Sequence, residues 1–220
     1  MSAVSKVSIK NLVLVPALIT LAITLLRLTG ELMNWSPLLF NKEAGGGGAL
    51  IGISWLVPIF GFYFARQLLK ANDQPASLGR VFGFSLLALA VFVGLFSLGF
   101  QFSRFSFGQI GMVLIAAVAG LFIARKAWPS LFSTLFAYGL AARIPVIIVM
   151  LMAIMGNWRT HYDVPPPGFP EMGTLATWAA IGLFPQLTIW MAFTVIIGSI
   201  FGGIAVAVAK RSPALARATS

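Results

Sequence analysis

The chain has 220 residues, of which 59% are hydrophobic and only 9% are charged, and its mean hydropathy is +0.96. Roughly a quarter of the residues in a soluble domain are charged, so this composition excludes an ordinary soluble domain and favours a protein surrounded by lipid. The net charge of +10 comes from Lys and Arg that stand singly or in pairs. Nucleic-acid binding needs a contiguous basic surface, so we expect no nucleic acid among the partners. Cys is absent and His161 is the only His, which excludes disulfides, thiolate sites and multi-histidine metal centres.

Long apolar runs predict the transmembrane segments. About 20 apolar residues cross the hydrocarbon layer as a helix, and runs of this kind lie near residues 11–29, 49–69, 81–101, 107–125, 130–156 and 176–208. The runs are continuous rather than alternating, which excludes a β-barrel. The predicted fold class is therefore all-α, a polytopic transmembrane bundle of about six helices that forms a single domain over residues 1–220. Prolines fall within four of the spans, where we expect kinks: Pro16, Pro58, Pro145 and Pro185.

The distribution of Lys and Arg predicts the orientation. With the N-terminus inside, four basic residues fall on the outer side and ten on the cytoplasmic side, namely Lys6, Lys10, Arg66, Lys70, Arg80, Arg125, Lys126, Lys210, Arg211 and Arg217. This asymmetry has the sign of the positive-inside rule, so both termini are predicted to be cytoplasmic. Residues 30–48 and 157–175 are then the long outer loops. The small, cysteine-free chain favours a multi-pass protein of a bacterial plasma (inner) membrane.

The last predicted span is too long to cross the membrane upright. We expect its first turns, residues 176–184, to lie along the interface before Pro185 bends the chain inward. Further along, small residues recur at helical spacing and let helices approach closely, namely Gly198, Gly202, Ala205 and Ala209. The expected use of this face is packing within the bundle, and the alternative is a homo- or hetero-oligomer formed through this helix.

Arg143 is the most informative residue, because it stands at the middle of the fifth predicted span. An Arg at that depth costs about 2.5–3.5 kcal/mol on insertion scales and normally faces the bundle interior or water. Gln186 and Thr188 of the last span lie at a similar depth, so adjacent antiparallel helices would bring them to Arg143. The functional interpretation is a site for an anionic group, such as a lipid headgroup or a carboxylate. The alternative is a structural Arg bonded to Gln186 and to carbonyls freed by Pro145, or one that snorkels outward.

The outer loop 157–175 is a second candidate site. It contains the only His of the chain together with other residues that could bind a ligand or take part in catalysis, namely Arg159, His161, Tyr162, Asp163 and Glu171. Three consecutive prolines stiffen the loop into an extended course. His161 and Asp163 would suit a general base with an orienting carboxylate, or two ligands of a weak metal site. A solvated, hydrogen-bonded connector explains the same residues, so we expect no bound metal and no cofactor.

The first outer loop, 30–48, follows an Arg27–Glu31 pair at the spacing of one helical turn, which favours an ion pair at the membrane edge. Four glycines, Gly45 to Gly48, come next. They are not followed by the Lys-Ser/Thr of a phosphate loop, so we interpret them as a hinge.

The absence of acidic residues from the span interiors disfavours coupling to protons or sodium, and no hydrolase, metalloprotease or nucleotide motif is present. We therefore expect a non-enzymatic membrane protein that binds or transports a small amphiphilic or anionic ligand, with no assigned catalytic residue. One alternative is a structural or accessory subunit of a membrane complex. A second alternative is an outer-face enzyme that uses His161 and Asp163.

Overall fold

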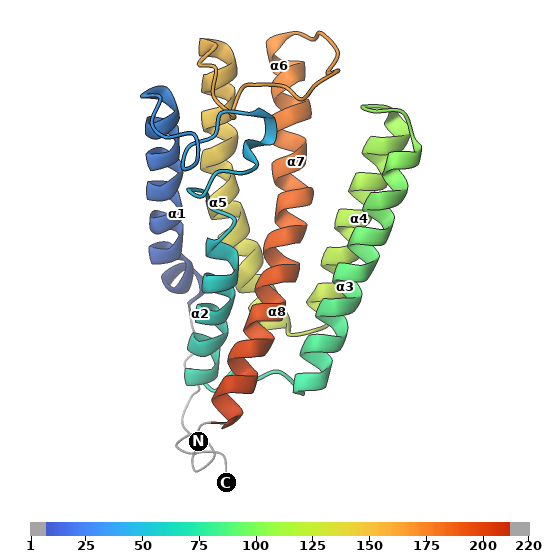
Figure 1. Ribbon diagram of the computed structural model, residues 1–220. Helices are drawn as coiled ribbons and strands as arrows, with labels where there is room; N and C mark the ends of the chain where they lie inside the picture. Colours follow the sequence, from blue (N-terminus) through green and yellow to red (C-terminus); the bar gives the residue numbers. More distant parts are fainter. Residues whose placement is uncertain (1–7, 212–220) are drawn as a thin grey trace.

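The computed structural model describes residues 8–211, in which the regular secondary structure is helical and no β-strand is present. Five helices are long and apolar enough to cross a membrane, and a sixth, shorter helix, α2 (Leu56–Lys70), packs among them. The predicted all-α transmembrane bundle is thus confirmed (Figure 1). The five long segments are α1 (Ile9–Leu32), α3 (Leu78–Leu98) with the turn η2 (Gly99–Gln101), α4 (Phe107–Arg125), α5 (Pro129–Gly156) and the stretch Thr174–Arg211.

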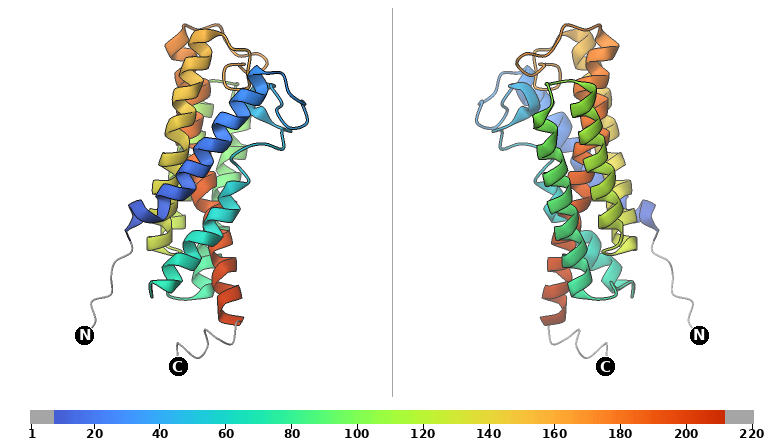
Figure 2. Two further views of the ribbon diagram at one scale, coloured as in Figure 1. Left: turned by 90° about the vertical axis from the view of Figure 1, so that its left-hand side faces the viewer. Right: turned by 90° about the vertical axis from the view of Figure 1, so that its right-hand side faces the viewer.

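The last of these segments is built from four consecutive helical pieces. They are α6 (Thr174–Thr177), the wider π-helical turn η3 (Trp178–Leu183), α7 (Phe184–Leu187) and α8 (Ile189–Arg211). Figures 1 and 2 show them following one another down the bundle, so the first turns do not lie along the interface as expected. The indole Nε1 of Trp178 donates a hydrogen bond of 3.0 Å to the carbonyl of Ile147, which fastens the start of this segment to α5.

The second predicted span, 49–69, is only partly helical. Residues 49–55 are irregular, and α2 begins at Leu56, so Pro58 lies in the first turn of a helix instead of kinking one. A first-turn proline lacks only an N–H that would have no helical partner there. Fifteen residues span about 22 Å, less than the roughly 30 Å of the hydrocarbon layer. α2 is therefore not among the helices long enough to cross a membrane, and the irregular residues 49–55 precede it.

The core of the bundle forms around α8, which packs against α2, α3, α4 and α5. The four small residues of the predicted packing face, Gly198, Gly202, Ala205 and Ala209, are all buried. A Cβ atom on Gly61 of α2 would overlap the backbone of Gly198, and one on Gly202 would overlap the side chain of Leu131 in α5. This face of α8 is thus occupied by helices of the same chain.

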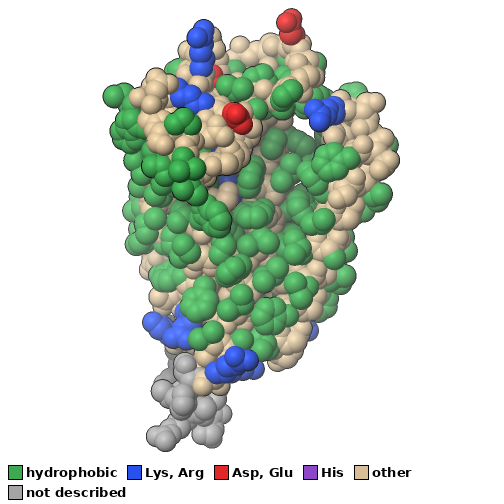
Figure 3. All heavy atoms as spheres, in the orientation of Figure 1, with side chains coloured by type: hydrophobic (Ala, Val, Ile, Leu, Met, Phe, Trp, Pro, Cys, Tyr) green, Lys and Arg blue, Asp and Glu red, His purple; other side chains and the backbone are tan. Residues whose placement is uncertain are grey.

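Charged side chains lie at the two ends of the molecule, and a broad hydrophobic band separates them on the face shown in Figure 3. Lys and Arg gather at the end where α2 finishes, α3 begins and α8 finishes, as the positive-inside rule predicts for the cytoplasmic side. Lys6 and Arg217, two members of the predicted basic set, lie outside the described residues. Trp35 and Trp158 follow the ends of α1 and α5 at the opposite end of the bundle, which carries the long loops (Figure 1).

The contact between Gly61 and Gly198 generates a stability prediction. We expect Gly61→Ala to force α2 away from α8 and to lower the free energy of unfolding by about 1–3 kcal/mol, the usual cost of overpacking. Gly83→Ala is the matched control, because Gly83 lies in α3 and a Cβ there would meet no atom within 4 Å. The control should be neutral or stabilise by up to about 1 kcal/mol through helix propensity. Unfolding in mixed detergent micelles measures both, and equal stabilities for the two variants would contradict this packing.

Candidate functional site

A cavity of about 530 Å³ lies in the outer half of the bundle. Its walls come from α1, α5, η3, α7 and α8, and the loop before α2 covers it. Exposed residues rim one end, among them Gly45, Gly47 and Trp55, whereas the other end reaches the buried Arg143. The volume falls within the range of roughly 300–1,000 Å³ that is typical of small-molecule sites. The cavity therefore connects the outer loops with the middle of the bundle.

Arg143 is only 3% exposed and lies 13 residues, about 20 Å of helix, from the outer end of α5. Its Nη1 donates to Oε1 of Gln186 at 3.5 Å, and its Nη2 donates to Oγ1 of Thr194 at 3.4 Å. Both contacts are at the long limit of hydrogen bonding, and both acceptors are neutral. The Nε atom is buried and has no hydrogen-bond partner.

No carboxylate contacts Arg143 anywhere within residues 8–211. The two ion pairs found there both involve Glu31, with Arg27 and with His161 as its partners. The nearest compensation is the ring of Trp190, whose centroid lies 5.0 Å from the Arg143 guanidinium carbon. A cation–π contact contributes about 2 kcal/mol when desolvated, well below the cost of removing a guanidinium from water. Arg143 is thus a buried cation that lacks a counterion and faces a cavity.

The wall between Arg143 and the cavity mouth is mainly apolar. Val146 and Met150 follow Arg143 on the same face of α5, at offsets of three and seven residues. Ile23 of α1 and Ile181 of η3 line the cavity as well. The arrangement of one deep charged group within an apolar chamber is the usual plan of a small-molecule site.

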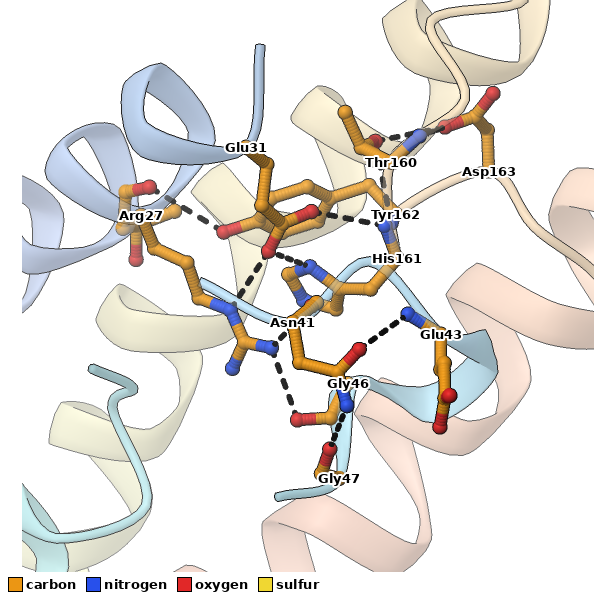
Figure 4. Close-up of polar contacts among 11 residues, drawn as sticks. Arg27, Glu31, Asn41, Glu43, Gly46, Gly47, Thr160, His161, Tyr162 and Asp163 are labelled. Atoms are coloured by element: carbon orange, nitrogen blue, oxygen red, sulfur yellow. Dashed lines mark hydrogen bonds and ion pairs between the residues drawn. The ribbon is translucent and has the colours of Figure 1, made fainter. Parts of the chain in front are cut away.

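A polar cluster lies beside the outer end of the cavity and centres on Glu31, which is fully buried in the last turn of α1. Oε1 of Glu31 accepts from Nε of Arg27 at 2.9 Å and from Nδ1 of His161, and Oε2 accepts from the backbone N–H of His161 at 2.9 Å (Figure 4). The Arg27–Glu31 ion pair predicted from the sequence spacing is therefore present. The partner of His161 is Glu31, 130 positions away, rather than Asp163.

The glycine loop rests on this cluster. Nη2 of Arg27 donates to the carbonyl of Gly46 at 2.9 Å and to that of Asn41 at 3.3 Å. Gly46 has a φ of +65°, and a Cβ there would lie against Arg27 and 2.5 Å from a carbon of the His161 ring. Glycine is required at this position by both the backbone conformation and the close approach. The loop predicted to be a hinge is thus held over the cavity by Arg27.

Burial sets the protonation of the loop side chains. It lowers the pKa of His161 below its ordinary value, because desolvation of the imidazolium outweighs the hydrogen bond to Glu31, and Arg27 acts in the same direction. Neutral His161 then donates its Nδ1–H to the Glu31 carboxylate. Burial also raises the pKa of the Tyr162 phenol, whose hydroxyl donates to the carbonyl of Thr24 at 3.3 Å.

The remaining predicted residues of the outer loop lie away from the cavity. Asp163 accepts hydrogen bonds from the backbone N–H groups of Arg159 and Thr160, at 2.8 and 2.7 Å, so it caps the turn in which it stands. Arg159 and Glu171 are exposed. Between Ser8 and Arg211, no group of three His, Asp or Glu side chains is arranged to hold a metal ion.

The predicted set Arg143, Gln186 and Thr188 is brought together in part. Gln186 contacts Arg143 and lines the cavity, but the hydroxyl of Thr188 donates to the carbonyl of Phe184 at 2.6 Å and Thr188 is not part of the lining. Sequence reasoning missed Trp190 and Thr194. These two follow Gln186 at offsets of four and eight residues, the spacing of one helix face, and that spacing is the signal by which they could have been found.

Comparisons with known proteins add no assignment to this geometry: no family model, no curated protein and no solved structure matches the chain.

The Glu31 cluster generates a second prediction. We expect Glu31→Gln to lower the free energy of unfolding by about 3–5 kcal/mol, because Arg27 would remain buried without its counterion. The control is Glu171→Gln, which removes the same charge from an exposed position and should change stability by less than about 0.5 kcal/mol. Thermal unfolding in detergent reports both variants. If Glu31→Gln unfolds like the control, the cluster does not hold the outer loops.

Proposed function

We propose that this protein binds a small anionic or amphiphilic ligand inside the membrane, with Arg143 as the partner of the anionic group. The observation that carries the proposal is the buried guanidinium, which has neutral neighbours and lines a cavity large enough for a small molecule. An ionisable group at this depth generally marks a functional site, because its burial is costly. A bound anion would offset that cost directly and would make hydrogen bonds roughly twice as strong as neutral ones.

The position of the cavity defines the form of this function. The lining residues belong to the outer half of the bundle, with Arg143 as the deepest charged group. In the proposed arrangement Gln186 orients the anionic group, and the Gly45–Gly48 loop together with residues 161–166 forms the cover. This geometry supports binding from the outer side of the membrane. We further propose that the membrane is a plasma (inner) membrane, on the basis of the basic residues at the end assigned to the cytoplasm.

Two other interpretations have less support. An accessory subunit that docks through the small-residue face of α8 would need that face to be free, and helices α2 and α5 already cover it. An enzyme that uses His161 and Asp163 as a dyad would need these side chains to meet. Instead, Asp163 accepts hydrogen bonds from backbone N–H groups, and the imidazole ring of His161 is hydrogen-bonded to Glu31.

Native mass spectrometry tests the proposal by comparing wild type with Arg143→Gln. Wild-type protein, purified in a neutral detergent, should carry an anionic molecule of discrete mass, and Arg143→Gln should lose it. Arg125→Gln is the matched control, because Arg125 is an exposed arginine at the opposite end of the bundle and should leave the bound molecule in place.

Circular dichroism and thermal unfolding establish that Arg143→Gln retains the fold. A folded Arg143→Gln protein that keeps the same bound molecule would show that Arg143 is structural. Ligand-free spectra for wild type, under conditions that preserve known lipid adducts of other membrane proteins, would also contradict the proposal.

A further inference from the structure

The charge inside the cavity restricts the charge of its ligand. Two arginines line the cavity, but Arg27 already forms an ion pair with Glu31, and neutral His161 adds no charge. Only Arg143 is uncompensated, so the cavity offers one net positive charge. In a site of low dielectric, a monoanion matches that charge, whereas a phosphate monoester with a charge near −2 would leave an excess negative charge buried.

The geometry of the guanidinium restricts the shape of the anionic group. The terminal nitrogens Nη1 and Nη2 each make a single long contact, 3.5 Å to Gln186 and 3.4 Å to Thr194. A planar carboxylate accepts two parallel N–H bonds from such a fork at about 2.7–2.9 Å, and it would replace both weak contacts. Gln186 also has an amide nitrogen, which within residues 8–211 donates one long bond, to the Met150 sulfur at 4.0 Å, so its second N–H can be given to a carboxylate oxygen.

The volume and the lining restrict the rest of the molecule. The cavity of about 530 Å³ is open at the end rimmed by the outer loops, so it has the size of a small-molecule site with an entrance on that side. The walls next to Arg143 are apolar and aromatic: Val146 and Met150 follow it in α5, and Trp190 of α8 faces its guanidinium. These walls fit a hydrocarbon or aromatic body.

From these three restrictions we infer that the ligand is a monocarboxylate with a single apolar chain or ring, whose carboxylate is held by the Arg143 fork and Gln186. This inference rests on the proposed function, since it names the class of ligand for the same cavity. The source of the molecule can be a single-chain lipid such as a fatty acid or a free aromatic acid, because both present the same carboxylate to the same fork.

A binding assay with matched head groups tests this class. Radiolabelled decanoate and 4-phenylbutyrate are bound to purified protein in a neutral detergent, and unlabelled decanoate, decyl phosphate and decan-1-ol compete for the site. We expect decanoate to displace the label best, with decyl phosphate and decan-1-ol weaker by about tenfold or more, the value of a charge-assisted bond that is lost or mismatched. Preference for decanoate would indicate a lipid source, and preference for 4-phenylbutyrate an aromatic one.

Two variants separate charge from geometry. Arg143→Lys keeps the positive charge but loses the planar fork, so carboxylate affinity should fall several-fold or more. Arg143→Gln should no longer bind either labelled acid, and Arg125→Gln should bind both like wild type.

The outcomes distinguish this inference from the proposed function. If decyl phosphate competes as well as decanoate, or if Arg143→Lys binds the carboxylate like wild type, the monocarboxylate class is wrong while an anion-binding protein remains. The same holds if neither labelled acid binds but native mass spectrometry still finds a molecule that depends on Arg143. If no molecule depends on Arg143 in either assay, both the class and the function are wrong.

Discussion

A cation that is transferred from water into a helix bundle needs a counterion or a polar substitute for water. Arg143 is the residue of this chain on which that requirement falls. The substitutes within the chain are two neutral oxygens at 3.4–3.5 Å and the face of Trp190. They come from a single face of the last membrane segment, so the register between α5 and that segment is tied to the guanidinium. The cavity beside it is the place where the missing negative charge would be supplied.

The second buried arginine solves the same problem within the chain, and the contrast is informative. Arg27 has a carboxylate at 2.9 Å, and its Nη2 donates to the carbonyl of Gly46 in the glycine loop and to that of Asn41 before it. The backbone and ring of His161 complete the shell of Glu31 and thereby join the second outer loop to α1. One arginine therefore acts as a structural anchor for the loops that cover the cavity. The other is left with unsatisfied hydrogen-bonding capacity at the bottom of the same cavity.

Much of this architecture follows from simple counting along the sequence. Apolar runs located the long helices, because lipid demands continuous stretches of about 20 residues. Counting 1.5 Å per residue from the helix ends placed Arg143 and Gln186 at a common depth, and they do contact one another. The spacing of Arg27 and Glu31 likewise predicted a pair within one helix. Contacts that depend on periodicity or depth could thus be predicted.

The rest depended on tertiary structure. The pairing of Glu31 with His161 joins residues 130 positions apart, and nothing in local spacing indicates it. The start of α2 at Leu56 reflects a preference of the glycine-rich stretch for irregular backbone that hydropathy alone does not measure. Thr188 has the right depth but the wrong direction, because its hydroxyl bonds to the carbonyl of Phe184 at a break in the helix. Depth can be counted from a sequence, whereas direction at an irregular turn cannot.

The most direct measurement for the central claim is the guanidinium of Arg143 itself. In protein labelled with ¹⁵N-arginine, the Nε–H resonance that disappears in Arg143→Gln identifies this residue. A buried cation without a counterion predicts an Nε–H that exchanges slowly with water and whose chemical shift moves when a carboxylate is added, while the resonance of Arg125 stays unchanged. A rapidly exchanging Arg143 signal, or one that no anion shifts, would show that the residue does not await a ligand in the cavity.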